Sequence, residues 1–352
     1  MTHAGESPRT TEAPLRAVLK AIIEHSRESL LVIDDSMRIE VANRSANNSF
    51  GRGERLDGRL LSEVIRDPEL HDAFRLAFDT GSASDLRVEI TGPEKLVFDT
   101  HIAPADLDGE RRAIGVFYDI TRIERLERVR QEFLSNISHE LRTPLTSILA
   151  FVETLQDGAI DDHENASRFL SVILRNAERM HGLIDDILEL SMIESGSVLI
   201  ELCRIKLAAV VDEIAASLSA KAAERGVTIE RSFGSDVEVF ADPRRLEQML
   251  TNLVDNAVKF NRETGPVEIT FEKSDGFDLI SVRDEGDGIR PDHVARIFER
   301  FYRIDRGRTR QVGGTGLGLA IVKHLARLHG GDIMVSSTLG TGTIFTLKLP
   351  SC

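Results

Sequence analysis

Apolar side chains that recur every seven residues on both sides of His139 impose the strongest constraint on this sequence. The first row is Leu134, Leu141, Ile148 and Leu155, and the companion row is Ile137, Pro144 and Phe151. This spacing predicts a long helix that packs along a seam, as in a two-stranded or four-helix assembly. With Leu134 at heptad position a, His139 falls at position f and faces away from the seam, into solvent.

The residues that follow His139 suit a nucleophilic imidazole. Glu140 comes directly after it, and Thr143 lies one turn further on the same helix face. A neutral imidazole is a nucleophile through one ring nitrogen when a neighbouring group orients or accepts the proton on the other, and a carboxylate can do so. An ordinary surface His-Glu pair is the commoner meaning of such a pattern, so these residues alone leave both interpretations open.

A second helix is predicted from about residue 166 to 195, after a break at Asp157-Gly158 and an acidic turn at 161–165. Its apolar rows also repeat every seven residues: Ile173, Met180 and Ile187, with Ala177, Ile184 and Ser191. Two antiparallel helices cannot bury such rows alone. Residues 133–196 are therefore expected to form a dimeric antiparallel four-helix bundle, with two helices from each chain.

Composition narrows the class of protein. A chain of 352 residues is long enough for two or three domains, and its net charge of −14 argues against nucleic acid as a direct partner. Two cysteines cannot make a disulfide framework, and the polar N-terminal segment lacks an apolar signal region. No run of 18 apolar residues occurs. We expect a cytoplasmic protein without a membrane span.

The first 132 residues divide into three predicted parts. Residues 1–14 are polar and predict a disordered tail. A short helix at 15–25 and several short strands predict a small α+β domain over 15–120. Residues 121–132 are charged and helical, and they lead into the seam as a signalling helix. The pattern IDDSMRIEVAN and the closing DIT at 119–121 resemble a PAS sensor domain, which implies an unidentified signal or ligand.

The nature of that PAS ligand stays open. A flavin photochemical site would need a reactive cysteine, and both cysteines, Cys203 and Cys352, lie outside the domain. Haem ligation by His25, His71 or His101 is an alternative, although a lone histidine is more often structural.

Residues 200–350 alternate helices with strands and predict a separate α/β sandwich domain. Helices are expected at 207–224, 243–260 and 316–329, and strands at 227–233, 237–240, 267–273, 278–283, 332–336 and 343–349.

Within this domain Asn252, Asn256 and Lys259 share one face of the second helix. Amide oxygens are ligands that suit Mg²⁺, and a lysine can neutralise phosphate, although an amphipathic helix with a polar face is the plain alternative.

Two glycine-containing segments complete the candidate site. Asp284, Gly286 and Gly288 follow a strand, where a buried carboxylate can accept the exocyclic amine of adenine and the glycines let the backbone approach a flat base. Tyr302 and Arg303 begin an arginine-rich segment that ends in a glycine run. The remaining candidates from that run are Gly314, Thr315, Gly316, Leu317 and Gly318. This composition is typical of a movable lid that cradles phosphates.

Five segments match the boxes of bacterial sensor histidine kinases in order and spacing. They are SHELRTP at 138–144, NLVDNAVKF at 252–260, DEGDGI at 284–289, FERFY at 298–302 and GGTGLGLAIVK at 313–323. The chain therefore resembles that family, and within it the phosphate-regulon sensor kinases, although those sensors usually carry membrane helices. The resemblance implies a multidomain fold: a PAS-like domain, the helical bundle and an ATP-binding domain of the histidine kinase and Hsp90-type ATPase class.

The resemblance also implies a role for each matching residue. His139 would be the phosphoacceptor, Glu140 its acid/base partner, and Thr143 would orient water when phosphate is removed from the partner. Asn256 would hold Mg²⁺ with Asn252 close by, Lys259 would meet phosphate and Asp284 would select adenine. The remaining residues expected at ATP are Gly286, Gly288, Tyr302, Arg303, Gly314, Thr315, Gly316, Leu317 and Gly318.

The function expected from these roles is that of a homodimeric histidine kinase that uses ATP and Mg²⁺. It would phosphorylate His139 and pass the phosphoryl group to an aspartate of a separate response regulator, and act as a phosphatase toward that regulator. Two rivals stay open: a non-catalytic nucleotide-binding sensor or scaffold, and an ATPase that uses the same nucleotide fold for conformational work.

Overall fold

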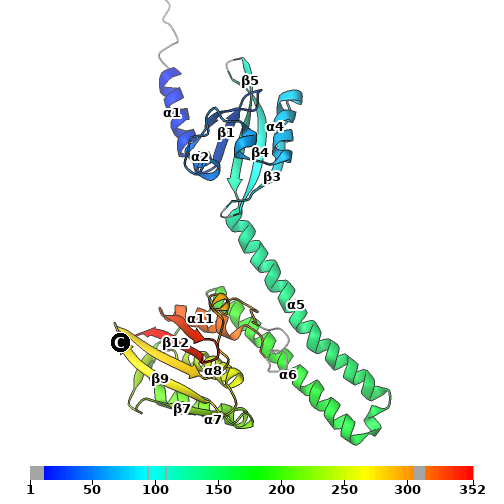
Figure 1. Ribbon diagram of the computed structural model, residues 1–352, viewed down its shortest axis with the longest axis vertical. Helices are drawn as coiled ribbons and strands as arrows, with labels where there is room; N and C mark the ends of the chain where they lie inside the picture. Colours follow the sequence, from blue (N-terminus) through cyan, green and yellow to red (C-terminus); the bar gives the residue numbers. More distant parts are fainter. Residues whose placement is uncertain (1–11, 93–94, 108, 305–313, 352) are drawn as a thin grey trace, which may run out of the picture. The chain divides into compact units, whose positions relative to one another are not determined.

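The computed structural model describes residues 12–92, 95–107, 109–304 and 314–351, which fall into two compact units, 1–132 and 133–352 (Figure 1). Residues 1–11 of the predicted tail lie outside this described part. The prediction was wrong for its last three residues, because α1 (Glu12–His25) begins at Glu12.

The first unit is an antiparallel sheet with helices. Its elements are β1 (Ser29–Ile33), β2 (Ile39–Ala42), α2 (Arg44–Gly51), α3 (Leu61–Val64), α4 (Pro68–Thr80), β3 (Ser84–Ile90), β4 (Leu96–Leu107) and β5 (Glu110–Asp119). The strand order is β2-β1-β5-β4-β3, and every neighbouring pair is antiparallel. The α+β prediction is confirmed, and the helices between residues 44 and 80 add detail that the strand pattern alone did not give.

Asn43 connects three elements of this unit. Its side chain is 1% exposed, accepts hydrogen bonds from the amides of Leu30 (3.0 Å) and Ala46 (2.9 Å), and so caps the N-terminus of α2. Its amide group donates to the carbonyls of Ile23 (3.0 Å) and Glu28 (2.9 Å). One buried asparagine therefore holds the end of α1, the start of β1 and the start of α2 together.

The histidines considered as haem ligands have local partners. The ring of His25 contacts the Ala21 carbonyl (2.8 Å), that of His71 the Ile65 carbonyl (2.8 Å), and that of His101 the carboxylate of Asp85 (2.6 Å). These contacts agree with the structural alternative for each histidine.

The second unit begins with a helical hairpin. Helix α5 (Thr121–Gln156) runs without interruption from the predicted signalling segment through Pro144. A short 3₁₀ turn (Ala159–Asp161) follows, and α6 (His163–Glu194) returns. The predicted start of α6 at residue 166 was three residues late, because the Asp162 side chain accepts hydrogen bonds from the amides of Glu164 and Asn165 and caps the helix there.

The rest of this unit is the predicted α/β domain. Its elements are β6 (Cys203–Lys206), α7 (Leu207–Glu224), β7 (Thr228–Arg231), β8 (Glu238–Ala241), α8 (Pro243–Phe260), β9 (Pro266–Ser274), β10 (Phe277–Asp284), α9 (Pro291–Val294), α11 (Gly318–Leu328), β11 (Asp332–Thr338) and β12 (Gly342–Pro350). The large sheet has the order β11-β12-β10-β9-β7, with β7 parallel to β9 and the other pairs antiparallel.

The predicted strand at 237–240 does not join the large sheet that the strands before and after it form. Strand β8 pairs with β6 in a separate two-stranded sheet, from Cys203 opposite Ala241 to Lys206 opposite Glu238. Strand β6 was not predicted. Only Ile205 of its four residues is half-buried and the others are exposed, so it carries no apolar alternation.

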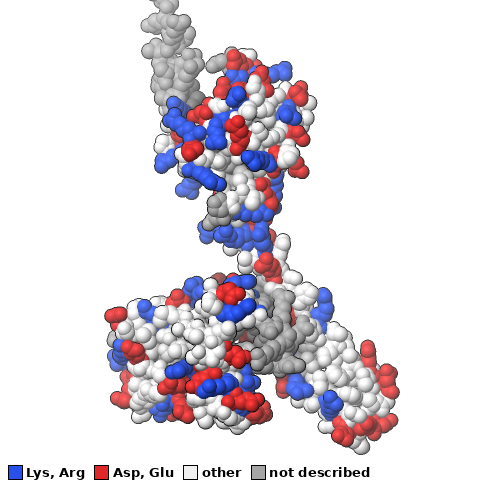
Figure 2. All heavy atoms as spheres, viewed as in Figure 1, with Lys and Arg blue, Asp and Glu red and all other residues white. Residues whose placement is uncertain are grey.

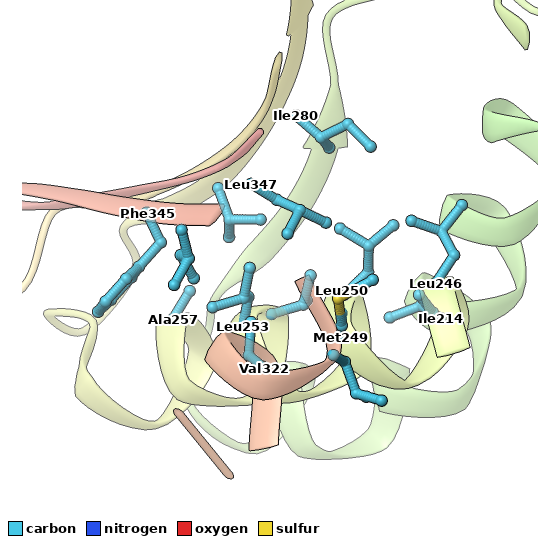
Figure 3. Close-up of a cluster of buried hydrophobic side chains, with 14 of the residues drawn as sticks. Ile214, Leu246, Met249, Leu250, Leu253, Ala257, Ile280, Val322, Phe345 and Leu347 are labelled. Carbon is cyan, nitrogen blue, oxygen red and sulfur yellow. The ribbon is translucent and has the colours of Figure 1, made fainter. Parts of the chain in front are cut away.

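The core of the α/β domain forms where α7, α8 and α11 pack together and against the sheet, as Figure 3 shows for α8. One face of α8 is fully buried: Leu246, Met249, Leu250, Leu253, Val254, Ala257 and Val258. On α6, Leu183, Leu190 and Ile193 belong to the same buried cluster. The C-terminal half of α6 is therefore packed onto the α/β domain.

Surface charge distinguishes the turn of the hairpin from its flank. Acidic side chains gather around the turn at the end of α5 and the start of α6, whereas the flank of the hairpin carries few charges in this view (Figure 2).

None of the described helices is both long and apolar enough to cross a membrane.

We predict that Asn43→Ala destabilises the first unit by at least about 2 kcal/mol, because it removes a helix cap and leaves buried amide and carbonyl groups without partners. Urea unfolding followed by circular dichroism should show an earlier transition. Asn48→Ala is the matched control, since Asn48 is exposed on the same helix. Equal transitions for the two variants would contradict this role.

Candidate functional site

His139 lies on the exposed side of α5, as the heptad position predicts. Thr143, also exposed, donates its hydroxyl hydrogen bond to the His139 carbonyl (3.2 Å) and so stays on the same face one turn away. Within the described part of the chain, no side chain forms a hydrogen bond or ion pair with the His139 imidazole. The ring is therefore accessible for reaction with a group brought from outside the hairpin.

Glu140 faces the other predicted domain. Its Oε2 atom accepts a hydrogen bond from Nη2 of Arg179 on α6 (3.0 Å) and lies 3.5 Å from Nη1 of Arg303. Arg303, predicted at the nucleotide, is nearly buried, with 7% of its side chain exposed. The structure thus brings together one predicted residue from the hairpin and one from the α/β domain. Arg179 was missed, because one arginine on an amphipathic helix gives no distinctive signal.

The segment before Arg303 also contacts α5. The Phe301 ring packs against Phe133 with centroids 5.7 Å apart, and the Arg300 guanidinium lies 5.3 Å from the Phe133 ring centroid. Phe301 has a backbone φ of 59°, a region that bulky residues rarely adopt. Its amide donates to the Gly316 carbonyl (2.9 Å), so this segment connects α5 with the start of the glycine run.

Tyr302 is held by residues of and near α9. Its hydroxyl lies 2.5 Å from Nδ1 of His293, and the Arg296 guanidinium stacks 4.4 Å from its ring centroid. The next predicted residues, 305–313, lie outside the described part of the chain and include the loop arginines and Gly313.

Asp284 is the buried carboxylate of the site. It is 6% exposed, and its Oδ1 accepts hydrogen bonds from the amides of Gly286 (2.9 Å) and Thr343 (3.2 Å). Burial raises the pKa of Asp284, while the two amides act in the opposite direction. Among the described residues none donates to Oδ2, which leaves that oxygen for a ligand donor such as an amine.

The backbone around Asp284 is packed so closely that three nearby positions require glycine. A Cβ at Gly286 would lie 2.0 Å from the Phe260 carbonyl oxygen, and one at Gly288 would lie 2.2 Å from that of Thr338. Gly342, which sequence reasoning missed, has a φ of 129° and room for no Cβ beside the Asp284 carbonyl oxygen (2.1 Å). The sequence feature that could have identified Gly342 is a glycine at the start of the last strand, which is easily taken as part of an ordinary turn.

The polar face of α8 lies opposite its buried face. Asn252, Asn256 and Lys259 are all partly exposed, and neither asparagine amide hydrogen-bonds to a described residue. A Cβ at Gly318 would lie 3.0 Å from Oδ1 of Asn252, so the absence of a side chain at Gly318 lets α11 approach α8 closely. Amide oxygens without protein partners suit a hard cation.

Lys259 has a fixed partner that the sequence analysis did not name. Its Nζ lies 2.5 Å from Oδ2 of Asp255, and Lys221 pairs with the same carboxylate. Burial alone would raise the pKa of Asp255, but the two lysines outweigh it and hold that pKa below its usual range.

The glycine run meets α6. The Thr315 hydroxyl donates to Oδ2 of Asp186 (2.6 Å) and accepts from the amide of Leu317 (3.2 Å). Burial raises the pKa of Asp186. Gly316 has a φ of 74°, and a Cβ there would lie 3.0 Å from Cα of Phe301, whereas Gly314 has no close neighbour. Thr315, predicted at the nucleotide, is thus bonded to the hairpin.

Comparison with known proteins agrees with this three-part organisation. Residues 23–125 match the PAS fold family, residues 129–196 the His Kinase A (phospho-acceptor) domain, and residues 241–351 the histidine kinase-, DNA gyrase B- and HSP90-like ATPase family.

Two curated relatives and one solved structure cover these parts. Sensor histidine kinase WalK of Bacillus subtilis is 39% identical over 67% of this chain and 39% of its own length. Sensor protein SrrB of Staphylococcus aureus (strain N315) is 28% identical over 94% of this chain and 55% of its own. The chain thus spans about half the length of these relatives or less.

The crystal structure of histidine kinase ThkA in complex with response regulator protein TrrA is similar in fold. It has a TM-score of 0.52 and 22% identity, and the match covers 94% of this chain and 98% of that one. From the domain matches, the curated relatives and the geometry above, this chain belongs to the sensor histidine kinases, with PAS, His Kinase A and ATPase domains in that order.

Proposed function

We propose that this protein is an ATP-dependent protein-histidine kinase that phosphorylates His139 and passes the phosphoryl group to an aspartate of a separate response regulator. The observation that carries the proposal is the contact between Glu140, next to the exposed His139, and Arg303 of the ATPase domain. This contact supports a mechanism in which the ATPase domain delivers the phosphoryl group of its bound nucleotide to His139 on the hairpin.

The residues of the ATPase domain fit a nucleotide with Mg²⁺. The domain match implies ATP as the ligand, and the buried Asp284 keeps one carboxylate oxygen without a hydrogen-bond donor among the described residues. Asn256 would hold Mg²⁺ with Asn252 close by, and Lys259 would lie toward the phosphates. ATP would supply the phosphoryl group, and Mg²⁺ would neutralise the charge of its phosphates.

The residues of the hairpin would carry out the acceptor chemistry. One ring nitrogen of His139 would receive the phosphoryl group, while Glu140 would orient and accept the proton on the other nitrogen. Thr143, on the same face, would orient a water molecule in a phosphatase reaction toward the regulator. Access to His139 would be regulated from the PAS domain through the continuous helix α5.

We also propose that the protein acts as a homodimer through the hairpin. Large apolar side chains of α5 and α6 are about half exposed within one chain: Leu134, Leu145, Leu149, Leu170, Leu174 and Leu188. The flank of the hairpin carries few charges in Figure 2. A second hairpin would bury these side chains in a four-helix bundle.

Two rivals remain distinct in their chemistry. A nucleotide-binding scaffold would bind ATP without forming phosphohistidine, and an ATPase would release inorganic phosphate independently of His139. The direct contact of Glu140 with two arginines favours the kinase over both, because neither rival needs a carboxylate held beside an exposed histidine.

We predict that incubation with γ-labelled ATP gives an acid-labile, alkali-stable phosphoprotein and that His139→Gln abolishes the label, because it removes the accepting nitrogen. His181→Gln should label normally, since His181 is an exposed histidine on α6. Label that survives His139→Gln would contradict the assignment.

We predict that Asp284→Asn weakens ATP binding about tenfold or more, through the loss of a charged acceptor, without lowering stability at neutral pH. The folded pKa of Asp284 lies above its unfolded value, so its ionisation opposes folding once the pH rises above the unfolded pKa. Calorimetric titration with ATP measures the change in affinity, and thermal unfolding measures the change in stability. Asp275→Asn, in an exposed turn of the same domain, is the control.

We predict that Leu174→Glu shifts the protein from dimer to monomer, because it places a charge in the apolar seam where Leu174 is 59% exposed in one chain. Light scattering measures the mass. Leu199→Glu should stay dimeric, because Leu199 is 84% exposed outside the hairpin helices; a dimeric Leu174→Glu variant would contradict the proposed seam.

A further inference from the structure

The carboxylate of Glu140 is fixed from within the hairpin itself. Arg179 lies on α6, and its Nη2 donates a 3.0 Å hydrogen bond across to Oε2 of Glu140 on α5. Both side chains are 25% exposed, so the pair is largely shielded from solvent. A charge-assisted hydrogen bond in such a position holds its partners more firmly than a fully exposed ion pair does.

Both arginine contacts involve the same carboxylate oxygen. Arg179 and Arg303 approach Oε2, and in the described part of the chain no group donates a hydrogen bond to Oε1. The carboxylate is thereby anchored at one oxygen, and the other stays free to receive a proton. The His139 ring, one residue earlier on α5, also forms no hydrogen bond or ion pair with the described residues.

The two arginines differ in where they belong. Arg303 comes from the ATPase domain, so its contact with Glu140 depends on how that domain lies against the hairpin. Arg179 and Glu140 lie on the paired helices of one hairpin, so their contact is made without any residue of the ATPase domain. Arg179 is therefore the partner of Glu140 within the hairpin.

We infer that Arg179 is a positioning residue for phosphoryl transfer to His139: it holds Glu140 through Oε2 and keeps Oε1 directed to the imidazole proton. This rests on the proposed kinase function. In the step, the bond from one imidazole nitrogen to the phosphorus of the substrate ATP forms. The bond from that phosphorus to the departing diphosphate oxygen breaks, and the proton on the other nitrogen passes to Glu140.

The first test compares Arg179→Gln with Arg175→Gln by initial rates of autophosphorylation of the full chain over a range of ATP concentrations. Arg175 is exposed on the same helix, one turn earlier, and forms no hydrogen bond or ion pair with a described residue. We expect kcat of Arg179→Gln to fall about tenfold, less than the roughly hundredfold or greater loss that removal of an acid–base group itself causes, with little change in KM for ATP. Arg175→Gln should match the wild type.

A lysine at this position separates positioning from a structural role. Arg179→Lys keeps the charge but lacks the planar fork of the guanidinium, so its kcat should lie between those of the wild type and Arg179→Gln. If Arg179→Gln does not fold, Arg179→Lys takes its place, with a reduced kcat at unchanged KM as the expected result. An unreduced kcat in the folded variants, or a rise in KM that accounts for the whole loss, would overturn the inference.

The double variant shows whether Arg179 acts through Glu140. Glu140→Gln alone should lower kcat about a hundredfold, and adding Arg179→Gln should lower it no further. An additional independent loss would overturn the inference. If the wild-type chain forms no His139 label, the proposed kinase function fails first; if it does and Arg179→Gln equals the wild type, only the role of Arg179 fails.

Discussion

The burial of one face of α8 is the interaction on which the candidate site depends. Seven side chains from Leu246 to Val258 fill the space between this helix, its neighbours and the sheet, and none is more than 3% exposed. This packing fixes the rotation of α8 about its axis. Because Asn252, Asn256 and Lys259 lie on the remaining face, the core also decides where these polar groups point.

The same core explains why residues far apart in sequence meet. Asp284 ends β10 in the middle of the sheet, where amides from both flanking segments reach its carboxylate. Further along the chain, Phe301 and Arg303 contact residues of α5, and Thr315 hydrogen-bonds to a residue of α6. Two polar contacts between the hairpin and the ATPase domain thus involve predicted site residues, Arg303 with Glu140 and Thr315 with Asp186, which makes each of these contacts a candidate point of control.

Most of the elements could be predicted because they carry strong local signals. The ends of α7 and α8 agree with the prediction, since apolar periodicity is clear in both and α8 is capped by Asp242 before Pro243. Strand β6 could not be predicted, because its pairing with β8 is set by tertiary position and not by alternation. Motif order predicted the candidate residues, whereas their partners Arg179 and Asp186 depend on which helices face each other. Asp255 lies four residues before Lys259 on α8, so its pairing could have been predicted from the helical spacing.

The packing of α6 onto the ATPase domain has an energetic consequence for any movement between them. Leu183, Leu190 and Ile193 are at most 4% exposed in the shared cluster. Separation that exposed two of these side chains would cost about 3–6 kcal/mol at roughly 1.5–3 kcal/mol each. By population arithmetic, only about one molecule in a hundred to one in ten thousand would then be separated spontaneously. Any ligand that separated them would have to stabilise the separated form by a comparable free energy, so the apolar contact on α6 sets an energetic threshold for such a movement.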